Sequence, residues 1–256
     1  MSRESMIEGR KSFVLDGTNG EAVLCLHGFT GSPGLYRQLA RELNAEGYTV
    51  CAPALPGHAT RPEDMIGCTA EDWLGFARQE LERLKGRHGA VHLVGISLGG
   101  ALCSILAAEN GDLASLSLLS PAYGLNPQLS ARLGLGATKT PPGYLVPIPT
   151  REPTGGELDE CLFGYSAFPL GASAQLHRAS DMAQAVCRQI RTPTLFLYTA
   201  ADRIADPEQC RQACALIGSV EESCRYEQSE HNLLLGCDRE DVKQRIKGHI
   251  LRHKTI

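Results

Sequence analysis

The chain is expected to adopt an α/β fold, in which helices flank a mostly parallel β-sheet. Three observations predict this class. Short, uninterrupted apolar runs alternate with amphipathic helical segments along most of the sequence. Strands buried on both faces of a parallel sheet need such runs, and the helices between them form the crossover connections. The 256 residues, 43% of them hydrophobic, also suffice to bury a core that needs neither disulfides nor a structural metal.

The predicted strands are apolar runs that end at glycines or polar turns. Each run is too short to be a helix that packs across a sheet. Seven segments fit this description: Ser12–Leu15, Ala22–Leu26, Tyr48–Ala52, Val91–Val94, Leu116–Leu119, Thr194–Tyr198 and Cys224–Tyr226.

The predicted helices are marked by capping residues and by apolar residues at helical spacing. Ser32 is expected to be an N-cap because Pro33 follows it, and Thr69 with Asp72 resembles a capping box. Glycines follow three of the helical patterns, as expected at helix ends. The five helices are expected from Pro33 to before Gly47, from Thr69 to Gly86, over Leu98–Ala108, from Asp206 to Ile217, and from Asp238 through Ile250.

One long segment, Pro121–Arg191, interrupts this alternation. It contains seven prolines after Pro121, and its regular periodicity is weak. Because it leaves the sheet just after a predicted strand, we expect an inserted cap over the carboxyl edge of the sheet. The predicted division is therefore a core of residues 1–121 and 192–256 and a cap of residues 122–191.

The strongest chemical motif is the G-x-S-x-G sequence from Gly95 to Gly99. It directly follows a predicted strand and directly precedes a predicted helix, which is the context of a nucleophile elbow. A sharp turn at that place exposes the hydroxyl of Ser97, and the flanking glycines avoid collisions with the neighbouring backbone. Ser97 is therefore the candidate nucleophile.

A serine nucleophile needs a base, and His231 is the predicted one. It lies in the loop after the last predicted strand, on the same sheet edge as Ser97. The other seven histidines have other expected roles. His27 and His58 are predicted to orient loops, His88, His249 and His253 to be solvated, His92 to lie in a strand, and His177 to lie in the insertion.

The base in turn needs a carboxylate that fixes its tautomer, and Asp202 is the predicted residue. It follows the strand Thr194–Tyr198 by a few residues. Asp206 is its competitor, but Asp206 precedes Pro207 and is better explained as a helix N-cap. The resulting chain order of serine, aspartate and histidine is that of the α/β-hydrolases.

Backbone amides must stabilise the negative charge that develops on the substrate oxygen. Two are predicted from loop position. The amide of Leu98 follows the nucleophile at a helix N-terminus, and the amide of Phe29 lies in the loop after the first core strand. These two amides are the expected oxyanion hole.

Together, the segments LCLHGFTG (24–31), Gly47-Tyr48, PGH (56–58) and GISLGG (95–100), with Asp202 and His231, resemble the carboxylesterase and monoacylglycerol lipase branch of the α/β-hydrolases. The short N-terminal hairpin is similar to that of compact bacterial carboxylesterases. The resemblance implies that the serine, aspartate and histidine form the triad and that the matching amides form the oxyanion hole. Ala59 replaces a frequent glycine, and the insertion matches no family motif.

Composition excludes several other classes. A net charge of −4 offers no basic surface for nucleic acid, and no apolar run is long enough to span a membrane. The ten cysteines form no C-x-x-C pair and are expected to be reduced. No metal or nucleotide motif is present, so neither cofactor nor metal is expected. The N-terminus has no signal-peptide pattern, which predicts a cytoplasmic protein of undetermined oligomeric state.

The expected activity is hydrolysis of carboxylic esters through an acyl-enzyme intermediate. The first part of the insertion, residues 122–150, contains only two charged residues among many apolar ones, which predicts an apolar pocket for a short to medium acyl chain or a monoacylglycerol. Packing of these side chains within the cap is the alternative. A thioesterase, a lactonase or a C–C bond hydrolase would use the same triad, and an inactive binding protein is the alternative outside enzymes.

Overall fold

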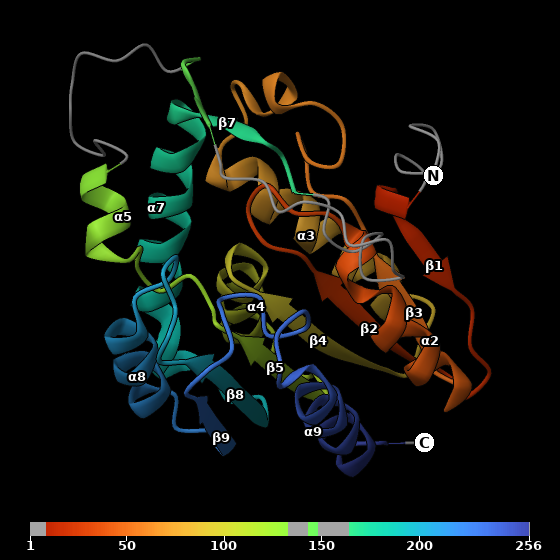
Figure 1. Ribbon diagram of the computed structural model, residues 1–256. Helices are drawn as coiled ribbons and strands as arrows, with labels where there is room; N and C mark the ends of the chain where they lie inside the picture. Colours follow the sequence, from red (N-terminus) through yellow and green to blue (C-terminus); the bar gives the residue numbers. More distant parts are fainter. Residues whose placement is uncertain (1–8, 133–142, 148–163, 256) are drawn as a thin grey trace.

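A computed structural model describes residues 9–132, 143–147 and 164–255 and has the expected α/β architecture (Figure 1). Its main sheet has seven strands in the order β1-β3-β2-β4-β5-β8-β9. All neighbouring pairs are parallel except β1 with β3. The seven predicted strands are confirmed, with small shifts at their ends: β1 Phe13–Leu15, β2 Glu21–Leu26, β3 Thr49–Ala52, β4 Ala90–Ile96, β5 Ser115–Leu119, β8 Thr194–Thr199 and β9 Val220–Tyr226.

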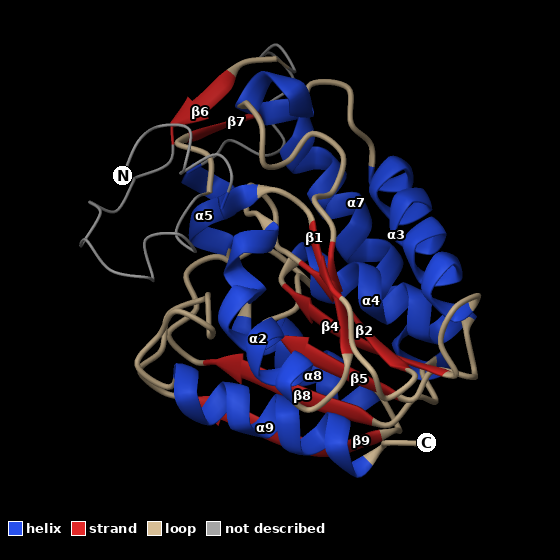
Figure 2. Ribbon diagram, turned by 90° about the vertical axis from the view of Figure 1, so that its right-hand side faces the viewer, coloured by secondary structure: helices blue, strands red, loops and turns tan. Residues whose placement is uncertain are grey.

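Helices cover both faces of this sheet (Figure 2). One face packs against α2 (Arg37–Ala45) and α9 (Arg239–Arg252). The other packs against α3 (Ala70–Lys85), α4 (Leu98–Glu109) and α8 (Pro207–Leu216), and α7 (Leu170–Val186) packs in turn onto α4 and α3. The described residues also include three short 3-10 helices, a short helix and a two-stranded antiparallel sheet: η1 Pro33–Tyr36, η2 Pro62–Met65, η3 Cys187–Gln189, α5 Pro127–Arg132, and β6 Leu145–Pro147 with β7 Ala167–Pro169.

The capping predictions have two different outcomes. The capping box before α3 is present, since the Thr69 side chain accepts from the Asp72 amide and the Asp72 side chain accepts from the Thr69 amide. Ser32 does lie at the N-cap position with Pro33 after it, as expected, but its side chain forms no cap hydrogen bond and its buried hydroxyl has no partner among the described residues. The first turn there is the 3-10 helix η1, in which the Ser32 carbonyl takes the Leu35 amide instead.

The insertion contains a long helix that its weak periodicity did not predict. The buried residues of α7 are mostly small, and α7 packs against α4, itself buried on almost all sides. Small residues let two helices approach closely but give little amphipathic contrast, so the helix was missed. The division into a core and a cap over 122–191 stays a prediction, and the structure adds that α7 contributes to the main hydrophobic core.

Two further expectations bear on the described residues. Nine cysteines in this part of the chain are free thiols, as expected for a reduced protein. Of the helices that the structure describes, none has the length and apolar character required to cross a bilayer.

Candidate active site

Ser97 lies in the turn between β4 and α4, with strained backbone geometry. Its φ of 54° and ψ of −119° are unusual for a residue with a side chain. Its amide donates to the Leu119 carbonyl at 3.0 Å, and its carbonyl accepts from the amides of Ala101 and Ala122. These bonds hold the turn and place the side chain beyond the carboxyl end of β4.

The glycines of this motif have separate steric reasons. A Cβ on Gly95 would lie 2.4 Å from the Gly99 carbonyl oxygen, and a Cβ on Gly99 would lie 1.9 Å from the Leu26 carbonyl oxygen. Both distances are far below normal contact, so side chains are excluded on both sides of Ser97. The sharp turn thus depends on glycine at each position.

Asp202 and His231 are in direct contact. His231 Nδ1 donates to Asp202 Oδ2 at 2.7 Å, and Asp202 Oδ1 accepts from the amides of Ile204 and Ala205 at 2.8 and 2.9 Å. Both carboxylate oxygens are therefore used, and the aspartate side chain is almost completely buried. Because Nδ1 carries the proton, the Nε2 atom of His231 has the free lone pair that a base requires.

The three predicted residues share one edge of the sheet, and two of them, Asp202 and His231, are joined by a hydrogen bond. Ser97 follows β4, Asp202 follows β8 and His231 follows β9, and these parallel strands end on the same side. The Ser97 hydroxyl forms no hydrogen bond within the part of the chain that the structure describes. Bonds of this kind often tighten only when substrate binds.

The competing carboxylate, Asp206, has a different position. Its side chain accepts from the Glu208 amide at 2.9 Å at the start of α8, as expected for an N-cap.

The loop that carries His231 is fixed by residues that the sequence did not single out. Thr199 Oγ1, at the end of β8, donates to the Ser229 carbonyl at 2.5 Å, and Ser229 Oγ donates to Asp238 Oδ2 at 2.6 Å. The Asn126 side-chain amide donates to the Asp202 carbonyl at 3.2 Å. These contacts hold the loops of Asp202 and His231 in place relative to each other.

The loop after β2 passes directly against Ser97. A Cβ on Gly28 would lie 3.2 Å from the Ser97 Cβ, so the backbone there approaches the serine as closely as a glycine permits. Phe29 is the next residue, and Leu98 is the first residue of α4. The first amides of a helix have no partner within the helix, so the Leu98 amide is a potential donor.

His27 and His58 are two buried histidines that contact the backbone of this region. His27 Nδ1 donates to the Gly28 carbonyl at 2.9 Å, while its Nε2 accepts from the Leu55 amide at 3.1 Å. Burial lowers the pKa of His27 to about 4 and that of His58 to about 3, so both rings are neutral near pH 7. Their expected role in orienting loops agrees with these contacts.

Tyr165 is a residue near the site that the sequence gave no reason to select. Its hydroxyl donates to the Gly57 carbonyl at 2.7 Å and accepts from the Thr60 amide at 3.1 Å, and its amide donates to the Thr30 carbonyl at 2.9 Å. Its ring also stacks on His58. The part of the insertion just before β7 is thereby joined to the loops after β2 and β3.

Two expectations about individual side chains need correction. His249 was expected to be solvated, but it is fully buried because α9 packs it against the start of β8. Tyr123, one of the apolar residues of the segment 122–150 from which a pocket lining is expected, is buried in the core instead, where its hydroxyl hydrogen-bonds with Ser104. Other apolar residues of that segment, Leu133, Leu135 and Ile148, lie outside the described residues.

The fold and the residues gathered at its carboxyl edge define a lipase-like hydrolase of the α/β type. The model of the alpha/beta hydrolase family matches residues 23–242, which is most of the chain, and the chain belongs to this family. The resemblance inferred from the sequence motifs is thus confirmed at the level of family and fold.

Individual relatives are lipases and esterases. The chain is 30% identical over 252 residues to a thermostable monoacylglycerol lipase of Bacillus sp. (strain H-257), covering 97% of each protein. It is 41% identical over 91 residues to a carboxylesterase of Bacillus subtilis (strain 168), covering 35% of this chain and 37% of that one. A solved structure from work on the metagenome-derived lipolytic enzymes LipS and LipT superposes with a TM-score of 0.82 at 26% identity, over 96% of this chain and 98% of that chain.

Proposed function

We propose that the chain hydrolyses carboxylic esters through a covalent acyl-enzyme, with Ser97 as nucleophile, His231 as base and Asp202 as the triad acid. The 2.7 Å hydrogen bond from His231 to Asp202 is the observation on which this proposal depends. It joins a base and an orienting carboxylate on the sheet edge that also carries the strained serine turn.

In this mechanism, Ser97 Oγ attacks the ester carbonyl while its proton passes to Nε2 of His231. The buried carboxylate of Asp202 stabilises the imidazolium, and the amides of Phe29 and Leu98 stabilise the oxyanion. The alcohol leaves with the proton from His231, and the acyl group stays on the serine. A water molecule activated by His231 then releases the acid and restores the serine hydroxyl.

We also propose short to medium acyl esters or monoacylglycerols as substrates. One support is the near full-length similarity to a protein named a monoacylglycerol lipase. The other is an apolar contact beside the loop after β2, where the Phe29 and Phe168 rings lie 5.4 Å apart between centroids, with Val146 nearby. Each CH₂ group buried against such a surface favours binding by about 0.8 kcal/mol.

The nucleophile is tested by labelling with a fluorophosphonate probe. Wild-type protein should be labelled, Ser97→Ala should not, and Ser223→Ala, on the exposed side of the edge strand β9, should be labelled at the wild-type rate. Ser97→Ala should also lose nearly all turnover. Labelling that persists in Ser97→Ala would refute the assignment, and a wild-type protein that is neither labelled nor active would indicate the binding-protein alternative.

The acid is tested by comparing two aspartates. Asp202→Asn keeps an acceptor for the amides of Ile204 and Ala205 but removes the carboxylate that fixes His231, so kcat should fall by about 10⁴-fold. Asp206→Asn should leave kcat nearly unchanged. The reverse ranking would reassign the triad acid.

The substrate class is tested with acyl esters from acetyl to lauroyl, and with matched thioesters and lactones. We expect kcat/KM to rise beyond acetyl and then to level off when the pocket is full. A maximum at acetyl would contradict the acyl pocket alone. A clear preference for thioesters or lactones would replace the ester assignment while keeping the triad.

A further inference from the structure

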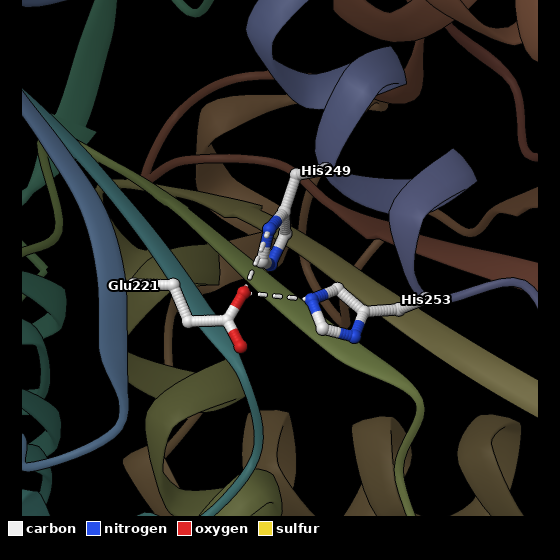
Figure 3. A group of neighbouring side chains, drawn as sticks. All are labelled: Glu221, His249 and His253. Atoms are coloured by element: carbon white, nitrogen blue, oxygen red, sulfur yellow. Dashed lines mark hydrogen bonds and ion pairs between the residues drawn. The ribbon is translucent and has the colours of Figure 1, made fainter.

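A second cluster of titratable side chains lies at the opposite edge of the sheet from Ser97. Glu221 is near the start of β9, and His249 and His253 are one turn apart on α9 (Figure 3). One atom from each, the Glu221 carboxylate oxygen, His249 Nδ1 and His253 Nε2, form a group in which all atoms lie within 4.8 Å of one another. His253 Nε2 is 2.8 Å from the Glu221 oxygen, and His249 Nδ1 is 4.0 Å from it.

The tautomer of His249 favours a ligand role. Its Nε2 donates to the Pro193 carbonyl at 3.2 Å, which leaves the lone pair on Nδ1, the atom that faces Glu221 (Figure 3). Histidine ligands of metal ions commonly use their second nitrogen in this way, because the carbonyl fixes both the ring orientation and the tautomer. The fully buried ring of His249 is thus already oriented by the protein.

The spacing suits a small divalent ion. Two ligand atoms of a tetrahedral zinc ion lie about 3.3 Å apart. The two separations from the Glu221 oxygen, 2.8 and 4.0 Å, lie on either side of this value, and all three atoms lie within 4.8 Å of one another, so small movements of the half-exposed Glu221 side chain and of the His253 ring bring the ligands to this spacing. Two imidazole nitrogens and one carboxylate oxygen are a ligand set that zinc accepts.

We propose that Glu221, His249 and His253 bind a zinc ion, with water completing the coordination. The ion replaces the hydrogen bond from His253 to Glu221 and joins the last turn of α9 to the edge strand β9. One cation adjoins the site: Arg252 lies 3.5 Å from His249 Nδ1, and it is held by Glu222 at 2.9 Å. The metal displaces the longer contact, and Arg252 keeps its carboxylate partner.

The position of this site implies a structural role. Ser97 and His231 follow the carboxyl ends of their strands, whereas Glu221 and Pro193 lie at the starts of β9 and β8. An ion at this edge stabilises the docking of α9 and takes no part in hydrolysis. Ester hydrolysis at room temperature should therefore be as fast after treatment with a chelator as before it.

The experiment uses the full chain, stripped with a chelator and titrated with Zn²⁺ in a calorimeter. We expect one equivalent to bind, with a rise in Tm, in the wild type and in His88→Gln, a histidine in the turn between α3 and β4. His253→Gln and Glu221→Gln should each bind at least tenfold more weakly and lose the rise in Tm. Glu221 is on the surface, so its variant keeps the test valid should the histidine variant fold poorly.

Cobalt replaces zinc in a second arm that identifies the ligands. The Co²⁺ protein should show the visible bands of a low-symmetry nitrogen and oxygen site, without a thiolate charge-transfer band. Such a band would place the metal on one of the free cysteines and overturn the proposal. Absence of stoichiometric binding would also overturn it, as would binding that both variants leave unchanged, for example binding at His231 that inhibits hydrolysis.

Discussion

Substituting alanine at Gly99 tests the steric argument for the serine turn most directly. The added Cβ would lie 1.9 Å from the Leu26 carbonyl oxygen, 2.4 Å from the Leu26 carbonyl carbon and 2.8 Å from the His27 carbonyl oxygen. Real Cβ atoms essentially never come closer than 3.0 Å to such atoms. All three neighbours are backbone atoms at the end of β2, so no side chain can rotate away to relieve the overlap.

The backbone must therefore move by about 1 Å where β4, α4 and β2 meet. Overpacking of this kind costs about 3 kcal/mol, which for a domain of this size lowers Tm by about 6 to 12 °C. The displaced residues lead directly into Gly28 and Phe29, so the same shift should move the predicted oxyanion amide. We expect the rate of fluorophosphonate labelling of Gly99→Ala to fall by at least about tenfold at a temperature where the variant is folded.

Gly75→Ala is the matched control, since it is also a glycine within a helix. An added Cβ there meets nothing within 4 Å. Alanine should stabilise α3 by about 0.5 to 1 kcal/mol through helix propensity, raising Tm by about 1 to 4 °C without affecting labelling. A Gly99→Ala protein with the Tm and labelling rate of wild type would refute the reasoning.

Three other predictions concern stability. Burial holds the pKa of His58 at about 3, whereas the pKa of this residue in the unfolded chain is about 6.5. As the pH drops, the unfolded state therefore binds the proton first. The free energy of unfolding should fall by about 1.4 kcal/mol per pH unit between pH 6.5 and pH 3. His58→Gln should make the urea midpoint less dependent on pH over that range, and an unchanged slope would contradict the buried neutral ring. Tyr165→Phe keeps the ring but loses the hydrogen bonds of the hydroxyl to Gly57 and Thr60, so thermal unfolding should show a loss of about 1 to 2 kcal/mol, and an unchanged Tm would argue against these contacts. Thr69→Ala should lower the free energy of unfolding by about 1 kcal/mol because the cap is lost, whereas Ser32→Ala should change it very little. Equal losses in calorimetry would contradict the difference between the two caps.

Local patterns were enough to predict the sheet and the site loops. The five central strands are fully buried and mostly apolar, because strands between two helical layers have no polar face, whereas the edge strand β9 alternates between exposed and half-buried residues. The motif around Ser97 depends on short-range geometry. Pro207 marks Asp206 as a helix N-cap, which leaves Asp202 as the candidate for the triad acid. These predictions needed only neighbours in the sequence and the rule that parallel strands end on one edge.

Features that depend on distant partners could not be predicted in this way. Tyr165 binds the loops after β2 and β3, more than a hundred residues away in sequence, and nothing in its own surroundings indicates that contact. His249 lies in a C-terminal helix rich in charged residues, yet the packing of α9 buries it beside Pro193. Ser32 precedes a proline as a cap should, but the 3-10 turn that follows removes the need for its side chain.

The way the insertion is attached has a consequence for recombination between relatives. Near its start, the Asn126 amide donates to the Ile204 carbonyl at 2.8 Å and its side chain to the Asp202 carbonyl; further along, Tyr165 binds Thr30 and Gly57 before α7 begins. Both points are thus fastened to loops at the carboxyl edge of the sheet. A chimaera can exchange only the stretch between Asn126 and Tyr165 for that of another family member. It should gain a new substrate range, while the loops at the carboxyl edge of the sheet keep their own contacts. Asn126 and Tyr165 are therefore suitable crossover points.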